Sequence, residues 1–482
     1  MTDVHDIRDA IIAALDDPDD SVGNPPRPGS IYVAPSHLKV LRLDAALVIG
    51  GRGVGKSFWT GALMSQDNRE LLSRSVSALG KAEFRIGYGT KGNPDAYPDG
   101  DTFKSLVRAD LRPYDVWRAI VARAFAPADD PVVPRGTWER TTRWVKDDPE
   151  AFARVLHAAD RRFGAAGTFG VIVFDGLDRI TADWRQIDEV VRDLLMISLT
   201  LATYDRLRPK VFLREDQFSR QAMDFPDASK LLSRRVELTW APHDLHGLLW
   251  QLLCNAEGRD GEILRGIFAS VAGSAPMSKL DSWVLPEVAK REGPVQKWLF
   301  EKLAGPWMGR DHRRGIPYTW TVGHLADGLG RTSPRSFRAA IRATAEVTRD
   351  RYSDHPFPFH YESIKRGVQQ ASRVRVREMA EEYRWVSPLL ESCEGLNVPS
   401  PFDQFRERWV TNFGGGPAGL VDSGLPRDVV DVGWDGVRAH LVRLGFLQEM
   451  ADGRVNMPDL YRVGFGLGRK GGVKRPTVHA DE

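Results

Sequence analysis

Eight consecutive residues combine closely spaced glycines with a lysine and a serine, in the pattern G-x-x-x-x-G-K-[ST]. They are Gly50, Gly51, Arg52, Gly53, Val54, Gly55, Lys56 and Ser57. Glycine reaches the backbone angles at which successive N–H groups can surround phosphate oxygens. Lys56 would place a cation on the β- and γ-phosphates, and the Ser57 hydroxyl would coordinate Mg²⁺. The segment predicts a binding site for ATP together with magnesium.

The residues on either side of this loop fit that prediction. Residues 45–49 are apolar and predict a buried parallel strand that leads into the loop. Residues from Phe58 to about Leu72 can continue as a helix whose N-terminus faces the phosphates, which places Phe58 beside the nucleotide. The alternative is a glycine-rich turn that carries Lys-Ser by chance, and the preceding strand argues against it.

A second chemical motif follows residues 171–174, which are apolar and predict another buried strand. Asp175 comes directly after this strand, at the sheet edge where open α/β folds bind ligands. It could hold Mg²⁺ directly or through water. Asp178 is placed either to orient an attacking water molecule or to cap a helix that begins near Ile180.

Arginines mark the ends of two later segments. Arg214 follows a predicted strand at residues 210–213 and could sense the γ-phosphate of ATP, or it could pair with Glu215 or Asp216. Arg234 and Arg235 lie between a short predicted helix and a fifth strand. One of them could reach the nucleotide of a neighbouring subunit, and we assign this role to Arg235. Both could equally be surface charges.

The order of these motifs resembles the AAA+ and STAND branches of the P-loop ATPases over about residues 41–350. Residues 175–178, Asp-Gly-Leu-Asp, resemble the Walker B segment of STAND ATPases, including NACHT proteins and bacterial conflict-system ATPases. That family commonly has Glu where this chain has Arg179, so the carboxylate that polarises water stays open. Residues 330–337 resemble the sensor-2 element of origin-recognition-type AAA+ proteins, which implies that Arg335 contacts the nucleotide. Without that role, Arg335 at a helix N-terminus would need an anionic partner.

Composition limits the remaining classes of protein. A chain of 482 residues predicts two to four domains, and a net charge of +2 provides no global attraction to nucleic acid or membrane. The two cysteines, Cys254 and Cys393, are too far apart in sequence for metal-ligand spacing. The acidic N-terminus, which includes Asp17, Asp19 and Asp20, does not resemble a signal peptide, and no run of eighteen apolar residues is present. We expect a cytoplasmic protein with no membrane association.

These elements predict an α/β P-loop NTPase core with a parallel sheet, followed by a helical lid and a C-terminal winged-helix-like domain. The expected divisions are an acidic segment and linker at 1–40, the core with a helical insertion at 41–240, the lid with the sensor-2 element at 241–355, and the C-terminal module with a basic tail at 356–482. Within the core we expect a loop at 87–101, a helix at 114–126 and a helix capped by Asp148 with Pro149 at its first position. Residues 242–254 should open the lid.

The C-terminal module has a pattern of its own. Residues 434–444 predict an amphipathic helix, and two short strands should pair across Asp452-Gly453, as in a winged helix. A basic strip of five cations against one acid lies at residues 361–377, where it is either a phosphate-binding surface or a solvated helix face. The strip contains Lys365, Arg366, Arg373, Arg375 and Arg377, and the tail adds Arg469, Lys470, Lys474 and Arg475. Duplex DNA is therefore a candidate partner, with protein docking as the alternative.

The motifs together predict an ATP-dependent molecular switch. The resemblance favours a prokaryotic conflict or antiphage system, with the effector or sensor on a partner protein. We expect ATP or ADP as the bound nucleotide and homo-oligomers in the ATP state. Two alternatives stay open. One is a DNA-bound initiator or loader that uses its winged helix, and the other is a scaffold that holds ATP without turnover.

Overall fold

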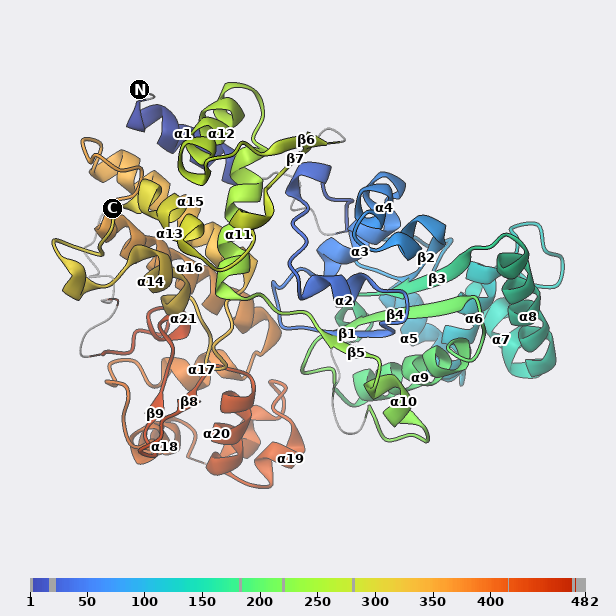
Figure 1. The fold of residues 1–482 in the computed structure, drawn as a ribbon. Coiled ribbons are helices and arrows are strands. Elements are labelled where there is room, and N and C mark those ends of the chain that lie inside the picture. The colour runs from blue at the N-terminus through green and yellow to red at the C-terminus, as the bar shows by residue number, and fades with distance from the viewer. Residues whose placement is uncertain are drawn as a thin grey trace. The chain divides into compact units, whose positions relative to one another are not determined.

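The computed structural model describes residues 3–16, 23–181, 184–218, 222–279, 282–414, 416–469 and 473. The chain forms two compact units, one of residues 18–239 and the other of residues 1–17 together with 240–482 (Figure 1). We call them the sheet unit and the helical unit. Residues 1–40, expected as one segment, are divided between the two. Asp17, Asp19, Asp20, Lys470, Lys474 and Arg475 lie outside the described residues.

The sheet unit is built on five parallel strands in the order β2-β3-β4-β1-β5. Their bounds are β1 Leu47–Ile49, β2 Ala82–Tyr88, β3 Phe169–Phe174, β4 Leu207–Leu213 and β5 Arg235–Glu237. Val48 lies beside Phe212 of β4 and Val236 of β5, so β1 occupies an interior position. The predicted parallel α/β core is confirmed.

Helices cover both faces of this sheet, which explains why the interior strands β1 and β3 are apolar along their whole length. The helices are α2 His37–Leu41, α3 Lys56–Met64, α4 Gln66–Ser73, α5 Gly100–Arg108, α6 Pro113–Phe125, α7 Trp138–Asp147, α8 Pro149–Ala165, α9 Trp184–Leu201 and α10 Ala228–Leu232, with 3₁₀ turns η1 Pro28–Ser30, η2 Ser77–Lys81 and η3 Leu177–Arg179. Alternate residues of β3 face opposite sides. Val171 and Val173 pack in the core that includes α3, whereas Ile172 and Phe174 pack with α6 and α9.

Local sequence signals placed several of these helices. The helix expected at residues 114–126 is α6, Pro113–Phe125, and Asp148 caps α8 by accepting a hydrogen bond from the Ala151 N–H at 2.8 Å. The helix expected from Phe58 to Leu72 is wrong in one respect, because the chain breaks at Ser65. The Ser65 backbone is extended, and its hydroxyl accepts from the Asn68 N–H to start α4 as a separate helix.

Strand β2 was not expected from the sequence, which suggested only inserted helices and a loop between the P-loop and β3. Its residues include Glu83 and Arg85, both on the outer edge of the sheet, where they pair with each other at 2.9 Å. An edge strand with charged side chains lacks the continuous apolar run by which interior parallel strands are recognised.

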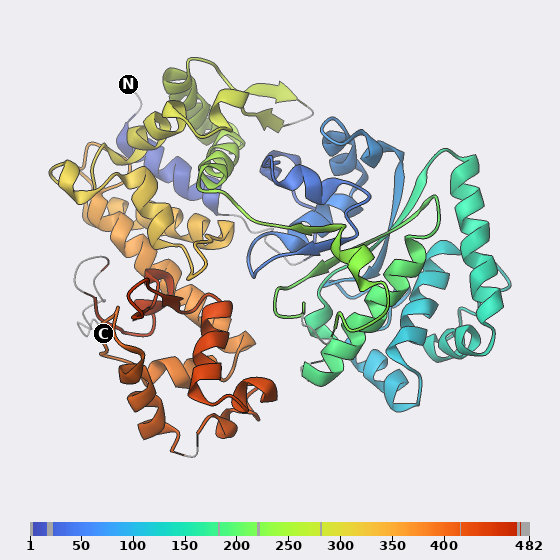
Figure 2. The ribbon, with the colours of Figure 1, turned by 60° about the horizontal axis from the view of Figure 1, so that its bottom comes forward.

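The helical unit begins with α1 Val4–Leu15, which packs against α12 Gly258–Ala272 and α15 Pro334–Arg351 (Figure 2). Its other elements are α11 Pro242–Cys254, β6 Met277–Lys279, β7 Ser282–Val284, η4 Glu287–Ala289, α13 Pro294–Ala304, η5 His312–Arg314, α14 Pro317–His324, α16 Tyr361–Glu382, α17 Val386–Glu391, α18 Phe402–Asn412, η6 Pro417–Leu420, α19 Arg427–Val430, α20 Trp434–Arg443, β8 Gln448–Glu449, β9 Val455–Asn456 and α21 Asp459–Arg462. Helices α15 and α16 pack closely, since a Cβ on Gly367 would lie 2.3 Å from the Ala340 carbonyl oxygen.

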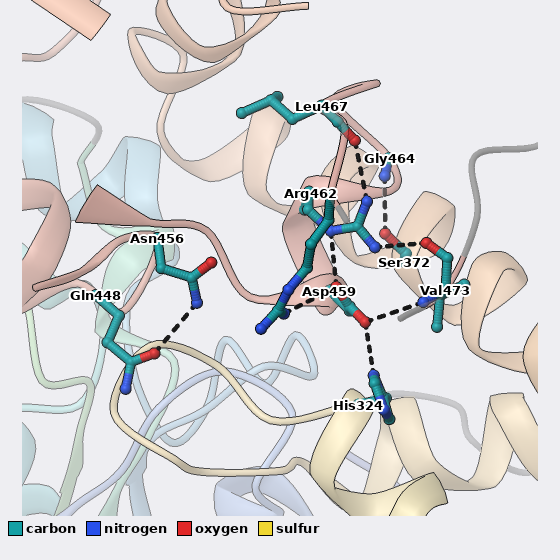
Figure 3. A network of polar contacts seen from close by, with 10 residues as sticks. His324, Ser372, Gln448, Asn456, Asp459, Arg462, Gly464, Leu467 and Val473 are labelled. Carbon is teal, nitrogen blue, oxygen red and sulfur yellow. Dashed lines mark hydrogen bonds and ion pairs between the residues drawn. The ribbon is translucent and has the colours of Figure 1, made fainter. Parts of the chain in front are cut away.

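The C-terminal helix and strand pair are present where the pattern places them. Gly445 ends the segment after α20 with φ of 78°, and Gln448 of β8 pairs antiparallel with Asn456 of β9. Whether this module is a winged helix stays a prediction. A polar network ties it to the rest of the unit (Figure 3). Asp459 contacts His324 at 2.6 Å and Arg462 at 2.7 Å, and these two contacts hold the pKa of Asp459 at about 2 although burial alone raises it.

Candidate functional site

The glycine-rich loop connects β1 to α3 at the carboxyl end of the sheet. Gly53 and Gly55 have φ of 75° and 104°, in the left-handed region that other residues rarely occupy. A Cβ on Gly50 would lie 2.8 Å from the Val54 side chain and 3.1 Å from the Leu238 carbonyl oxygen, so the loop is packed tightly on the end of β5. No side chain caps the N-terminus of α3. Its first N–H groups therefore stay available to an anion.

Lys56, the first residue of α3, points back into the loop. Its ammonium group donates to the Gly50 and Gly51 carbonyl oxygens at 2.8 and 2.7 Å. Burial lowers the pKa of Lys56 to about 8, against the opposing charge of Asp175, so the group is still mostly protonated at pH 7. The cation is thus held inside the loop that should surround the phosphates.

Ser57 and Asp175 lie together, as magnesium binding requires. The Ser57 side chain hydrogen-bonds to the Asp175 carboxyl group. Asp175 is 2% exposed at the end of β3, and its Oδ2 atom has no hydrogen-bond partner in the described structure. Burial raises the pKa of Asp175, and Ser57 and Lys56 act against that increase. A buried carboxylate oxygen next to a hydroxyl group is a donor set that fits Mg²⁺, a cation that prefers oxygen ligands.

The loop after β2 also reaches this site, which the sequence did not indicate because β2 itself was missed. The Asp175 N–H donates to the Tyr88 carbonyl oxygen at 3.0 Å, so β2 ends beside the carboxylate. A Cβ on Gly176, whose φ is 68°, would lie 2.8 Å from the Thr90 side chain. Arg179 donates to the Thr90 carbonyl oxygen. Arg179 is thereby directed toward the end of β2.

Arg214 and Asp178 are close to each other at the ends of β4 and β3. The Arg214 guanidinium makes a two-point contact with Asp216 at 3.0 and 2.5 Å, and it lies 3.9 Å from Asp178. The Arg214 side chain is 16% exposed and Asp178 is 51% exposed. Asp178 lies in η3, and α9 begins at Trp184, so the helix expected to begin near Ile180 is not present there. The alternative pairing of Arg214 with Asp216 is the one that the structure contains.

The two arginines near β5 lie on the surface of the sheet unit. Arg234 and Arg235 are exposed, and Arg235 lies 3.4 Å from Glu237 and over the Phe218 ring. Their action on a neighbouring subunit's nucleotide stays a prediction.

Arg335 belongs to the helical unit, in the first turn of α15. It pairs with Glu378 of α16 at 3.1 Å. The anionic partner expected for a cation at a helix N-terminus is therefore present in the same unit. Contact of Arg335 with nucleotide stays a prediction.

The basic strip on α16 needs correction. Arg375 is only 9% exposed and contacts Glu378 at 3.4 Å, with Tyr461 also bonded to it, so it cannot present its charge to a phosphate backbone. Lys365 pairs with Glu362 at 2.7 Å. Helical periodicity turns one side of any long packed helix toward the core, and Arg375 lies on that side. The strip therefore has Arg366, Arg373 and Arg377 as its remaining cations.

Two further observations concern absences in the part of the chain described. It contains no group of three or more His, Cys, Asp or Glu side chains arranged to hold a metal ion. None of its helices combines the length and apolarity needed to cross a bilayer. A magnesium site at Ser57 and Asp175 would have to take its other ligands from nucleotide and water.

Comparison with known proteins gives little additional support. No family model matches the chain, and no curated protein matches it. Among solved structures, the chain is similar to the Aeropyrum pernix ORC2 protein in its ADPNP–ADP complexes, with 11% identity, a TM-score of 0.30 and coverage of 92% of this chain and 93% of that one. A similarity of this size is too low to assign a fold or a family.

Proposed function

We propose that this protein binds ATP with Mg²⁺ and hydrolyses it at the carboxyl edge of the sheet unit. The observation that supports the proposal most is the convergence of Lys56, Ser57 and Asp175, with Lys56 held in the loop and Asp175 keeping an unpaired buried oxygen. Of the functions considered, only nucleoside triphosphate binding uses all three groups and the uncapped N-terminus of α3.

Each residue has a separate role in this proposal. The loop amides and Lys56 hold the phosphates, and Ser57 and Asp175 hold the metal ion. Magnesium, when bound, neutralises charge on the transferred phosphoryl group. Asp178 orients the attacking water molecule, supported by its exposed position and its distance of 3.9 Å from Arg214.

Hydrolysis would serve a switch of the AAA+/STAND type. The Arg214 guanidinium is paired with Asp216. A γ-phosphate that competes with Asp216 for this guanidinium would distinguish ATP from ADP, which is the difference in affinity that a switch needs. The sensor role of Arg335, a trans-acting Arg235, assembly in the ATP state and an antiphage setting with an effector partner belong to the same proposal. They rest on the resemblance of the motifs.

The test is nucleotide binding by Lys56→Ala, with Lys39→Ala as the matched control because Lys39 is an exposed lysine of the same unit. Loss of a charged phosphate contact of about 3 kcal/mol should weaken ATP binding roughly 100-fold. Isothermal titration with ATP and Mg²⁺ measures this, and release of inorganic phosphate measures turnover. Equal affinity in Lys56→Ala and the parent protein would refute the site. ATP binding without release of inorganic phosphate would instead support the alternative function, a scaffold that holds ATP without turnover.

A further inference from the structure

The chain between α13 and α14 is an exposed loop in which aromatic and basic side chains are concentrated. Residues 305–316 contain Trp307, Arg310, His312, Arg313 and Arg314, with Asp311 as their one acidic residue. All five of these aromatic and basic side chains are exposed. In Figures 1 and 2 the loop is the yellow segment that extends outward beyond α13 and α14. Nothing in the predicted ATP site or switch uses this surface.

The loop has a defined conformation. The Met308 N–H donates to the Gly315 carbonyl oxygen at 2.9 Å and closes the loop at its base, while the Met308 side chain is 2% exposed and anchors it. Gly305 and Gly315 adopt φ of 71° and 95°, which glycine permits. The Asp311 carboxylate accepts from the Arg313 N–H at 2.9 Å and so caps η5. A basic loop that is already ordered loses less conformational entropy when it binds a ligand.

Its arginines have no ion-pair partner within the described residues. No salt bridge involves Arg310, Arg313 or Arg314, and the nearby acid Asp311 makes its contact through a backbone N–H. In contrast, Arg438 of the predicted helix pairs with Asp435 and Glu449, and Arg454 of the predicted wing pairs with Asp452. The cations of the loop are therefore available to an external anion.

The charge extends onto α13. Residues 297–316 contain five basic residues and two acidic ones, a formal charge of +3, whereas the whole chain of 482 residues carries +2. Lys297 and Lys302 on the exposed side of α13 supply the other two cations, again without an ion-pair partner in the part of the chain described. This is a local field that the near-neutral total conceals.

Two tryptophans accompany these cations. Trp298 of α13 is 53% exposed and Trp307 is 37% exposed. Exposed tryptophans next to arginines are the combination by which proteins stack bases and contact the adjacent phosphates. A membrane surface would require a continuous apolar face, but the exposed positions of α13 include Lys297, Glu301 and Lys302 as well as Trp298.

We infer that the loop at residues 305–316, with the exposed side of α13, binds the phosphate backbone of nucleic acid. The arginines contact phosphates without reading base sequence, and Trp307 stacks on a base where the strand is unpaired. This surface shares no residue with the predicted helix and wing or with the α16 strip. The inference does not depend on the proposed ATPase activity.

The test uses the full-length protein and a fluorescent 20-nucleotide probe, as a single strand and as a duplex, with fluorescence anisotropy at several salt concentrations and no nucleotide. Arg310, Arg313 and Arg314 are replaced together by Ala. The matched control replaces Arg366, Arg373 and Arg377 of α16 by Ala, which removes the same charge. In the loop variant the slope of log K against log salt should become shallower by about 2 to 3, from three lost phosphate contacts. The control should keep the parent slope.

Two further variants make the result specific. Replacing the three loop arginines by Lys preserves charge and should retain most of the affinity. Trp307→Ala should weaken single-strand binding about ten-fold, as loss of one stacked base requires, and leave duplex binding nearly unchanged. ATP affinity should be the same in every variant, which separates a failure here from a failure of the proposed nucleotide site.

Three results would overturn the inference. The first is that the parent protein binds neither probe at about 50 mM salt. The second is that the loop variant and the α16 variant lose the same amount of nucleic-acid affinity. The third is that the loop variant loses binding to anionic vesicles that the parent protein binds, while its nucleic-acid affinity is unchanged.

Discussion

At the scale of single residues, the state of Asp175 is the informative feature of the candidate ATP site. A buried carboxylate without a paired cation is costly, and burial accordingly raises its pKa. The nearby Lys56 ammonium is hydrogen-bonded to the Gly50 and Gly51 carbonyl oxygens. A divalent cation beside Asp175 would stabilise the charged form. The cost of the buried carboxylate is thus consistent with metal binding at this position.

Replacing Asp175 and Asp178 separately by Asn should distinguish the effect on ATP binding from the effect on ATP turnover. Asp175→Asn removes the metal-binding charge, so we expect weaker ATP binding in magnesium and no measurable hydrolysis. Asp178→Asn keeps the shape of a half-exposed side chain, so ATP should still bind while kcat falls roughly 100-fold. Asp67→Asn, an exposed carboxylate of α4, is the control. Hydrolysis at the parent rate by Asp178→Asn would move the role to Glu215 or Asp216.

His246 of α11 illustrates a buried group that makes stability depend on pH. Its Nε2 atom contacts the Tyr318 carbonyl oxygen at 3.0 Å, and its Nδ1 atom is buried without a hydrogen-bond partner in the described structure. A second proton would have no acceptor. Burial lowers the pKa of His246 to about 3 from 6.5, although the bond to Tyr318 acts in the other direction.

The sign of the pH effect follows from that shift. Between pH 6.5 and 3 the unfolded chain binds a proton at this residue and the folded chain does not, so stability falls as pH falls. The slope from this residue is about 1.4 kcal/mol per pH unit. His246→Phe should reduce the slope measured by denaturant unfolding, whereas His5→Gln at an exposed position should not. An unchanged slope in His246→Phe would contradict the assignment.

At the scale of elements, α1 is held in the helical unit by one side chain. Arg8 is fully buried and donates to the carbonyl oxygens of the segment before α16, namely Ser353, His355, Phe357 and Pro358. Its guanidinium thus satisfies backbone groups that would otherwise be buried without partners. Helix α1, which begins the acidic segment expected at residues 1–40, is therefore a structural part of a unit that resumes at residue 240.

Arg8→Met keeps most of the volume but leaves those carbonyl groups unpaired. We expect the free energy of unfolding of the helical unit to fall by about 2 to 4 kcal/mol. ATP binding by the sheet unit should be unchanged. Arg259→Met is the control, because Arg259 forms an exposed ion pair with Asp6 and such pairs contribute little. Chemical denaturation followed by tryptophan fluorescence measures the difference, and similar losses in both variants would contradict the role of Arg8.

At the scale of the whole molecule, the sheet unit is an insertion in the helical unit. The chain leaves the helical unit near residue 17 and re-enters it at residue 240. Arg335, the predicted sensor, is paired with Glu378 inside the helical unit. A nucleotide phosphate would compete with this carboxylate for the Arg335 guanidinium.

We therefore expect ATP, ADP and the nucleotide-free state to differ in shape or mass. Small-angle scattering and mass photometry on the same preparation measure both quantities. Arg335→Ala should remove the difference between ATP and ADP while the affinity for ADP stays close to that of the parent protein. Identical scattering curves and masses in all three states would count against a switch.

The sequence alone determined the features that depend on neighbouring residues. The glycine-rich loop after β1, the Asp148 cap of α8 and the strand pair across Asp452-Gly453 all follow from spacing, capping chemistry and the backbone freedom of glycine. These signals act within a few residues, so they could be recognised without knowledge of the fold.

Only the tertiary structure decided which charged residues are paired and which are exposed. Arg375 and Arg314 both belong to basic stretches, yet Arg375 is buried against Glu378 and Tyr461 while Arg314 is exposed. Arg214 meets Asp178 only because β3 and β4 are adjacent, and β2 is a strand because β3 offers it a parallel partner. Burial and long-range pairing depend on segments far apart in the chain, and the free energy of a charge depends on its surroundings more than on its sequence neighbours.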